Sequence, residues 1–369
     1  MAGHWIPLSA CQISSKDRFV FSDTQSMRFF RVFFCLIFLV AGFSFSFPNS
    51  RFSGAVPAYG DDYSTYYSLK KKKRFYNTFF ICPETVKTPF KSDSYYVVTK
   101  EEFYSLLDWK DLPLLLNNDI FAFYGNPRSK KMGILGEYSL EDLEPILLEY
   151  AKAYDAANGE SRGVIPALYL IYGTCLPEGK IGYLPENIVK KYIDYAAQRG
   201  WLVFLDHQIG RYSVESAMEK LLHFLKYPNV HLALDPEWST DRPMEVTGSI
   251  TGEELNSAQK IMSDYISSHN IPGNRILVVH QFKPMMIKNS SVVSGNFTSV
   301  NLVHCADGFG NPPLKRLTYK SNTKIKNMPV KAFKLFFKGP VEGAGYDDPL
   351  MTPEEVYTLE PKPRVIMYQ

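Results

Sequence analysis

The chain has 369 residues, of which 45% are hydrophobic and 21% charged, so it is not disordered throughout and can form one large domain with an additional segment. Lysine and arginine number 41 against 38 aspartate and glutamate, which gives a formal net charge of +3. This balance argues against the concentrated basic surface that nucleic-acid binding requires. The cysteine count is 5, an odd number, so the sequence predicts no disulfide framework.

The first predicted feature in chain order is a secretory signal at residues 27–47. Arg28 and Arg31 precede an apolar run from Val32 to Gly42, and small residues follow among phenylalanines, as in signal peptides. The run is about ten residues long, shorter than the roughly 20 that a membrane-spanning helix needs. We therefore predict a leader and signal peptide over residues 1–47, and a secreted or envelope-associated protein that meets the membrane only through this segment.

Residues 48–118 come next and are rich in Tyr, Ser, Lys and Pro, with no sustained apolar period. We predict an irregular linker or barrel-covering segment here. The basic run from Lys70 to Arg74 is interpreted as solvated surface charge. A nuclear signal or a contact with anionic lipid is the alternative.

From residue 119 to residue 369, short apolar runs rich in β-branched and aromatic residues alternate with helical stretches, as in parallel βα units. Eight strands in about 250 residues fit a closed (β/α)8 TIM barrel. An open doubly wound sheet fits less well, because no Gly-rich dinucleotide turn follows the first strand. The sequence ends just after the eighth strand, so the predicted barrel lacks the last helix. The strands are expected at 120–124, 164–172, 201–205, 230–234, 276–279, 300–303, 332–337 and 365–368.

Helix starts are predicted where a hydroxyl residue precedes a helical run. At two of them a glutamate follows three positions later, which is the capping box, in which each side chain bonds the other's backbone amide. Gly200 separates a helical run from the third strand, where a left-handed residue lets the chain turn back. The predicted N-caps are Ser139, Ser213, Thr251 and Thr352.

The active site of this fold lies at the carboxyl ends of the strands, and polar residues end four of the predicted strands. Side chains alternate along a strand, so Asp235 and Glu237 are expected on one side, about 7 Å apart, as are Asp206 and Gln208. Two carboxylates on one rim suit general acid and base catalysis, since repulsion and burial raise one pKa. The remaining polar residues at these ends are Trp238, His280, Gln281, His304 and Asp307.

Structural roles remain open for the same residues. Asp206 and Asp235 can cap or orient turns, and Asp307 lies in a Gly-containing turn that Asp favours for its own backbone hydrogen bonds. His280 and His304 can be hydrogen-bonded rim residues. Glu237 beside Trp238 is harder to explain in this way, because a carboxylate next to a large aromatic at a strand end resembles a sugar subsite.

Four strand-end phrases together resemble a family of uncharacterised exported bacterial proteins, many described as lipoproteins, that are similar to glycoside-hydrolase barrels. The phrases span residues 232–238, 278–282, 304–310 and 348–353. The resemblance covers about residues 119–369 and implies the barrel and export, but no known activity.

A fainter similarity is to the chitinase-type barrels, whose fourth strand ends in alternating acids with a catalytic glutamate. Asp235 and Glu237 match the last two acidic positions, whereas Val230 and Leu232 depart from the pattern. What remains in common is an acid at the end of the fourth strand, which is an analogy at the level of the fold.

The leading hypothesis is a secreted hydrolase that acts on cell-wall or matrix polysaccharide without a cofactor. Glu237 is its general acid, and Asp235 or Asp206 is the carboxylate partner. The residues expected to contact substrate are Trp238, His280, Gln281, His304, Asp307 and Gln208.

Two other classes of function stay open. One is a metal-dependent hydrolase in which His280, His304 and Asp206, with Asp235 or Glu237, converge on a divalent ion. The other is a non-catalytic carbohydrate-binding surface protein that kept the barrel. The sequence does not indicate an oligomeric state.

Overall fold

The computed structural model describes residues 12–13, 19–20, 114–115, 118–159, 162–271 and 273–369. The predicted signal at 27–47 and nearly all of the segment 48–118 lie outside these residues, so both stay predictions. Near the N-terminus, β1 (Gln12–Ile13) pairs antiparallel with β2 (Phe19–Val20). No helix in the described part of the chain is long and apolar enough to span a membrane.

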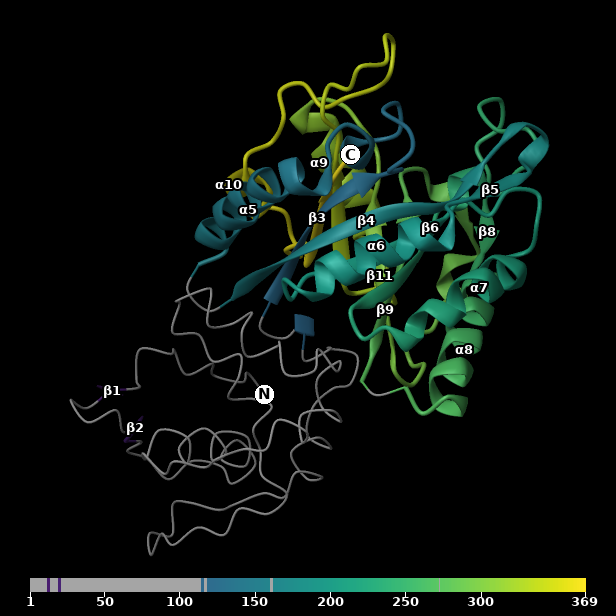
Figure 1. The fold of residues 1–369 in the computed structure, drawn as a ribbon, viewed down its shortest axis with the longest axis horizontal. Coiled ribbons are helices and arrows are strands. Elements are labelled where there is room, and N and C mark those ends of the chain that lie inside the picture. The colour runs from purple at the N-terminus through teal and green to yellow at the C-terminus, as the bar shows by residue number, and fades with distance from the viewer. Residues whose placement is uncertain (1–11, 14–18, 21–113, 116–117, 160–161, 272) are drawn as a thin grey trace, which may run out of the picture. The chain divides into compact units, whose positions relative to one another are not determined.

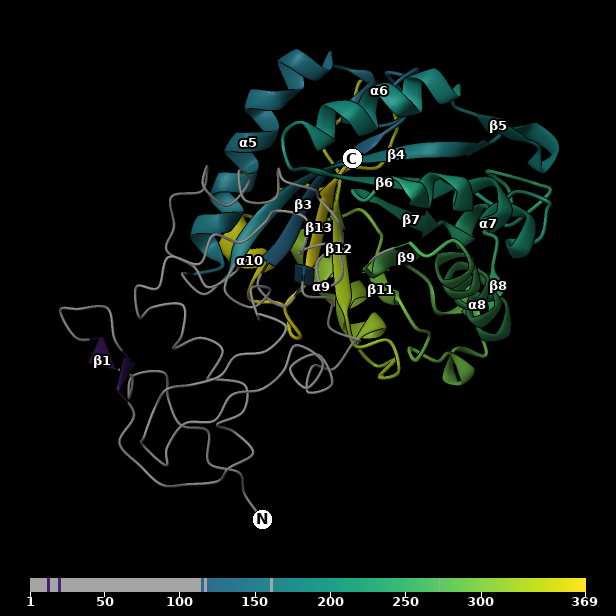
Figure 2. The same cartoon turned by 60° about the horizontal axis from the view of Figure 1, so that its bottom comes forward.

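Eight parallel strands close into a barrel, in sequence order around the ring (Figures 1 and 2). The last strand pairs with the first, with Val365 opposite Ile120. The predicted (β/α)8 barrel is therefore confirmed, and closure removes both edges of the sheet. The strands are β3 (Asn118–Gly125), β4 (Gly163–Cys175), β6 (Leu202–His207), β7 (Val230–Leu234), β9 (Arg275–Gln281), β11 (Val300–Ala306), β12 (Lys331–Leu335) and β13 (Val365–Tyr368).

Helices cover the outside of this barrel (Figures 1 and 2). The predicted N-caps are confirmed: the Ser139 hydroxyl accepts from the amide of Asp142 at 3.1 Å, and Thr251 and Thr352 form complete capping boxes. Gly200 has the expected left-handed backbone, with φ of 66°. The helices are α5 (Leu140–Ala157), α6 (Glu186–Ala197), α7 (Val214–Leu222), α8 (Gly252–Ser268), α9 (Pro312–Asn322) and the short α10 (Pro353–Val356).

The connection from β9 to β11 departs from the expected alternation of strand and helix. It consists of two 3-10 turns, η8 (Pro284–Met286) and η9 (Ser290–Val292), around the short strand β10 (Ile287–Lys288). Asn289 has a left-handed backbone with φ of 51°, which interrupts any helix, and Pro284 lacks an amide donor.

Inward and outward side chains alternate along the barrel strands, and aromatic residues fill both sides. Inside the barrel, Tyr169 of β4 stacks on Phe204 of β6 with ring centroids 4.9 Å apart. Outside, Phe121 of β3 packs against Tyr154 of α5 and Tyr368 of β13. The side chains at the carboxyl ends of the strands therefore stand on a packed aromatic layer.

The closing pair of strands is held by a buried ion pair at its amino-terminal end. Arg364 donates from Nε to the Asp119 carboxylate at 2.6 Å and from Nη2 to the Asn118 carbonyl at 2.9 Å. Tyr357 also donates to Asp119, at 3.1 Å. These contacts hold the first and last strands together at this end of the barrel.

Candidate functional site

Four carboxyl groups meet at the carboxyl-terminal end of the barrel, on its inner side. They come from β6, from the turn after β7 and from the residue after β11. Each of these carboxyl groups interacts through its charge with at least one other, and His280 of β9 and Lys334 of β12 also affect their pKa values. We call Asp206, Asp235, Glu237 and Asp307 the acidic cluster.

A chain of polar contacts crosses the barrel through Asp307 of this cluster. Lys334 Nζ lies 3.2 Å from Asp307 Oδ2, and the same oxygen lies 2.9 Å from His280 Nδ1. His280 Nε2 is 2.9 Å from the hydroxyl of Tyr169. An ionised Asp307 can only accept hydrogen bonds, so His280 donates through Nδ1 and, when neutral, accepts from Tyr169 at Nε2.

Asp307 is the carboxyl group of the cluster that is held ionised. Burial by itself raises its pKa, but the charge of Lys334 and the contacts with His280 outweigh burial and lower it. For Lys334, burial lowers the pKa, yet the surrounding carboxylates, Asp307 first, raise it. The ammonium group also lies 3.9 Å from the ring centroid of Tyr124. Asp307 and Lys334 therefore form a buried ion pair.

Asp206 is fully buried and has one clear hydrogen-bond donor. The hydroxyl of Tyr124 donates to its Oδ2 at 2.8 Å, and His280 Nε2 lies 3.8 Å from the same atom. Its other oxygen, Oδ1, has no hydrogen-bond partner. Burial raises the pKa of Asp206, while His280 and the Tyr124 hydrogen bond oppose that rise.

Asp235 has the least support of the four. It is 1% exposed, and its Oδ1 has no hydrogen-bond partner. Its backbone amide still donates to the carbonyl of His207 at 3.1 Å, so Asp235 continues the inward alternation of β7. Burial, then repulsion from Glu237, Asp206 and Asp307, raises its pKa well above the usual range.

The predicted strand geometry of Asp235 and Glu237 is wrong. β7 ends at Leu234, and residues Pro236–Trp238 form the 3-10 turn η7, because Pro236 has no amide to continue the ladder. Glu237 is half-buried in this turn, and its charge still interacts with those of the other acids in the cluster. Burial, then repulsion from Asp307, raises the pKa of Glu237 to about 7.

The predicted pairing of Asp206 with Gln208 fails for a similar reason. β6 ends at His207, after an irregularity in its pairing with β4 between Ile171 and Gly173. The Gln208 Oε1 atom accepts from the backbone amide of Cys175 at 2.8 Å. Gln208 thus joins the loop after β6 to the end of β4.

His304 and Gln281 lie on the outer side of the barrel, away from the acidic cluster. His304 Nε2 is 2.7 Å from Gln281 Oε1, and His304 Nδ1 is 2.9 Å from Lys331 Nζ. Lys331 also donates to the carbonyl of Asn322 in α9. The hypothesis that His280 and His304 converge on one metal is wrong, because alternation places them on opposite faces of neighbouring strands.

No three His, Cys, Asp or Glu side chains are arranged to hold a metal ion among the residues that the structure describes. Trp238 is half-buried and adjacent to Glu237 of the cluster, and its indole group opposes the rise of the Glu237 pKa. Its carbonyl accepts from the amide of Gly210 at 3.1 Å, which joins the loops after β6 and β7.

Sequence reasoning missed three residues of the site, namely Tyr124, Tyr169 and Lys334. Lys334 gave a signal, since a lysine in the middle of an apolar strand of a barrel needs a charged partner inside. The two tyrosines gave none, because aromatic residues in apolar strands are usually core. Only their hydroxyl partners, Asp206 and His280, mark them as part of the site.

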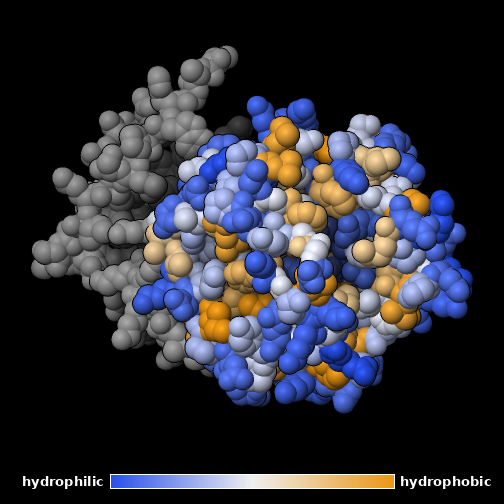
Figure 3. Space-filling view, turned by 90° about the horizontal axis from the view of Figure 1, so that it is seen from above, coloured by the Kyte–Doolittle hydropathy of each residue, from blue (hydrophilic) through white to orange (hydrophobic). Residues whose placement is uncertain are grey.

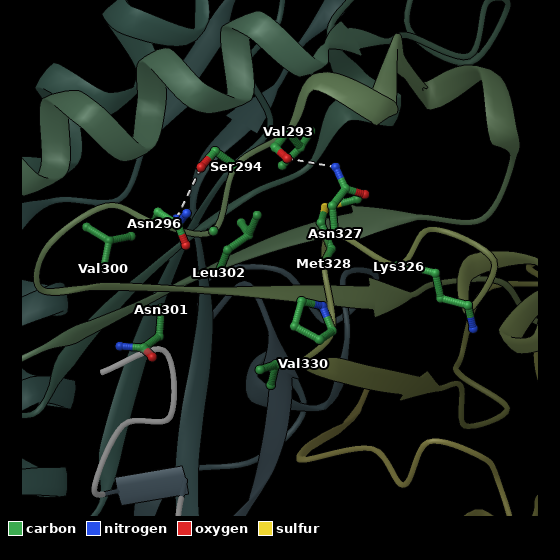
Figure 4. Close-up of a pocket in the computed structure, with 12 residues that line it drawn as sticks. Val293, Ser294, Asn296, Val300, Asn301, Leu302, Lys326, Asn327, Met328 and Val330 are labelled. Atoms are coloured by element: carbon green, nitrogen blue, oxygen red, sulfur yellow. Dashed lines mark hydrogen bonds between the residues drawn. The ribbon is translucent and has the colours of Figure 1, made fainter. Parts of the chain in front are cut away.

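A separate cavity of about 310 Å³ lies before the amino-terminal ends of β11 and β12 (Figure 4). Its walls include Asn327, whose side chain donates to the carbonyls of Ser290 and Val293. Leu302 and Asn301 project to opposite sides of β11 there. The cavity is therefore at the other end of the strands from the acidic cluster.

The sequence matches no protein-family model and no curated protein. Three solved structures show similarity at low identity. Oxaloacetate acetylhydrolase in complex with oxalate is 12% identical, with 70% of this chain and 79% of that chain covered and a TM-score of 0.39. A chitinase from Chromobacterium violaceum is 8% identical, with 59% and 68% covered and a TM-score of 0.35. A sugar phosphate isomerase/epimerase from Parabacteroides distasonis is 13% identical, with 67% and 89% covered and a TM-score of 0.32.

These three neighbours are enzymes by name, and they do not agree on a reaction. Likeness at this level concerns the fold. The resemblance to exported glycoside-hydrolase-like proteins stays a prediction from the strand-end phrases, and the function has to be argued from the side chains.

Proposed function

We propose that this chain is an exported glycoside hydrolase that works through carboxyl groups, with Glu237 as the general acid. The observation that carries the proposal is the state of Glu237: it is half-buried, at the edge of a buried acidic cluster, with a pKa of about 7. A carboxyl group with such a pKa is about half protonated at neutral pH and can protonate a leaving glycosidic oxygen. Export rests on the sequence of residues 27–47.

Asp206 is the better ionised partner of the two that the sequence offers. The Tyr124 hydroxyl donates to it, and His280 lies close by, whereas the Asp235 carboxyl has no comparable donor. An ionised carboxylate here stabilises the positive charge that develops on the sugar ring in the transition state. Asp307 is held by Lys334 and His280 and adds to the negative potential.

The surface around the barrel fits a polar ligand. The face seen from above in Figure 3 is largely hydrophilic, with apolar residues scattered among the polar ones. Trp238, half-buried next to Glu237, offers an aromatic surface on which a sugar ring can pack.

The test starts with a screen of polysaccharides and aryl glycosides, run with and without a chelator. On any substrate found, Glu237→Gln should lower kcat by about 10²- to 10⁴-fold, because the amide keeps the size of the side chain but cannot transfer the proton. The matched control is Glu245→Gln, an exposed residue of the loop after η7, which should keep full activity.

Full activity of Glu237→Gln would remove this residue from the mechanism. Activity that is lost with chelator and restored by a divalent metal would favour a metal-dependent hydrolase instead.

A further inference from the structure

Two carboxyl oxygens inside the barrel have no hydrogen-bond partner among the residues that the structure describes. They are Asp206 Oδ1 and Asp235 Oδ1, on residues that are 0% and 1% exposed. A buried acceptor without a donor costs about 1–3 kcal/mol, so such atoms are rare unless a ligand or water satisfies them. Both atoms belong to the acidic cluster, beside the proposed general acid.

The charges around Asp235 are not balanced. The groups that act on its charge are Asp206 from β6, Glu237 from η7, Asp307 from beyond β11 and Lys334 from β12, together with the hydroxyls of Tyr124 and Tyr169 from β3 and β4 and the thiols of Cys175 and Cys305 from β4 and β11. Lys334 is already paired with Asp307 at 3.2 Å. The charge of Lys334 is thus matched by Asp307, which leaves Asp206, Asp235 and Glu237 without a lysine of their own, so an additional cation would be attracted to them.

We propose that Asp235, at the carboxyl-terminal end of the barrel, binds a primary ammonium group of the substrate, and that the substrate is a polymer of amino sugars with free amines. This inference rests on the proposed function, because it assigns a substrate class to the same site. An ammonium group carries three donors and no acceptor, which matches carboxylate oxygens that lack a donor.

The position of the amine follows from the chemistry of the sugar. When the glycosidic oxygen is held at Glu237, a C2 amine is two carbon atoms away. Glu237 is the charged group that acts most strongly on Asp235, so we assign the amine to Asp235. An N-acetyl group at the same position has one donor and a carbonyl acceptor, and a hydroxyl has no charge. Both are poorer partners for an unsatisfied carboxylate.

Binding of the ammonium group is coupled to loss of a proton. Without ligand, Asp235 holds a proton because its neighbours repel a further negative charge. An ammonium group favours the ionised form, so a proton leaves when the ligand binds. Affinity for the amine should therefore rise with pH up to the point at which the amine itself loses its charge.

The experiment is calorimetric titration of the full chain carrying Glu237→Gln, which blocks turnover, with glucosamine tetramers that are fully deacetylated or fully acetylated. At pH 6 the deacetylated tetramer should bind at least about tenfold more tightly. Titrations in two buffers with different ionisation enthalpies should show proton release only with the deacetylated tetramer. Equal affinities, or no proton release, would overturn the proposal.

Two variants on the same background locate the effect. Asp235→Asn should remove the preference for the free amine, whereas Asp241→Asn, an exposed control in the following loop, should keep it. A preference that survives Asp235→Asn contradicts the assignment. If Asp235→Asn does not fold, thermal shifts of the unmodified chain with methyl glycosides of glucosamine and N-acetylglucosamine make the same comparison.

Methylammonium chloride distinguishes an amino-sugar site from a general amine site. Competition by methylammonium as strong as that of methyl glucosaminide would overturn the assignment to sugars. The experiments distinguish failure of this inference from failure of the proposed function. Glu237-dependent hydrolysis of neutral glycans, without preference for amines, would refute only the inference about the amine. Tight binding of the deacetylated tetramer with release of a proton, but without turnover by the unmodified chain, would refute only the proposed hydrolase function.

Discussion

Replacing Lys334 by methionine tests the charge balance of the barrel interior. Lys334 Nζ lies 3.2 Å from Asp307 Oδ2, and both side chains are almost fully buried, at 3% and 5% exposure. At an effective dielectric constant of about 20, two unit charges at this distance attract by roughly 5 kcal/mol. Breaking one side of such a pair costs about 3–5 kcal/mol, because it leaves a buried charge without compensation.

The loss should depend on pH in a defined direction. In the native chain the pKa of Asp307 is lowered by Lys334 and His280 against the effect of burial, so its contribution is present above the unfolded pKa of about 3.9 and is lost as pH falls through the folded pKa. In Lys334→Met the folded pKa rises, and Asp307 takes up a proton at higher pH. The deficit is therefore largest near pH 8 and smaller near pH 5.

The assay is urea unfolding at both pH values, with the exposed Lys362→Met as control. The double variant Lys334→Met with Asp307→Asn should recover part of the lost stability, since both charges are then absent. A loss below about 1 kcal/mol, or an equal loss at pH 5 and pH 8, would refute the buried ion pair.

Two further predictions concern the general acid and the fold. Because the general acid must be protonated, kcat/KM should fall about tenfold per pH unit above pH 7, the pKa of Glu237. A pH profile measured on any substrate found checks this. Activity that rises from pH 7 to pH 9 contradicts the assignment. Thr251→Ala removes the complete capping box of α8 and should cost about 1 kcal/mol of unfolding free energy, whereas Ser267→Ala, an exposed change near the other end of α8, should cost much less in the same denaturation series.

The predictions from the sequence are confirmed where they depend only on residues that are close together in the chain. A hydroxyl followed by glutamate three positions on, as in Thr251 and Thr352, satisfies backbone amides within one turn, so no tertiary contact is needed to predict it. The eight apolar runs marked the strands for the same reason, and the barrel that they predicted is the closed sheet observed. No helix forms between β9 and β11, because Pro284 lacks an amide donor and Asn289 has a left-handed backbone.

Which strand-end residues share one site was decided by the tertiary structure. His280 and His304 stand at equivalent places in the sequence pattern, yet the register between β9 and β11 pairs His280 with Cys305 and turns His304 outward to Lys331. A shift of one residue in the pairing moves every side chain of a strand to the other face, and the sequence does not specify this register. Tyr169 became part of the site only because the closed barrel brings β4 within hydrogen-bonding distance of β9, a contact between residues far apart in the chain.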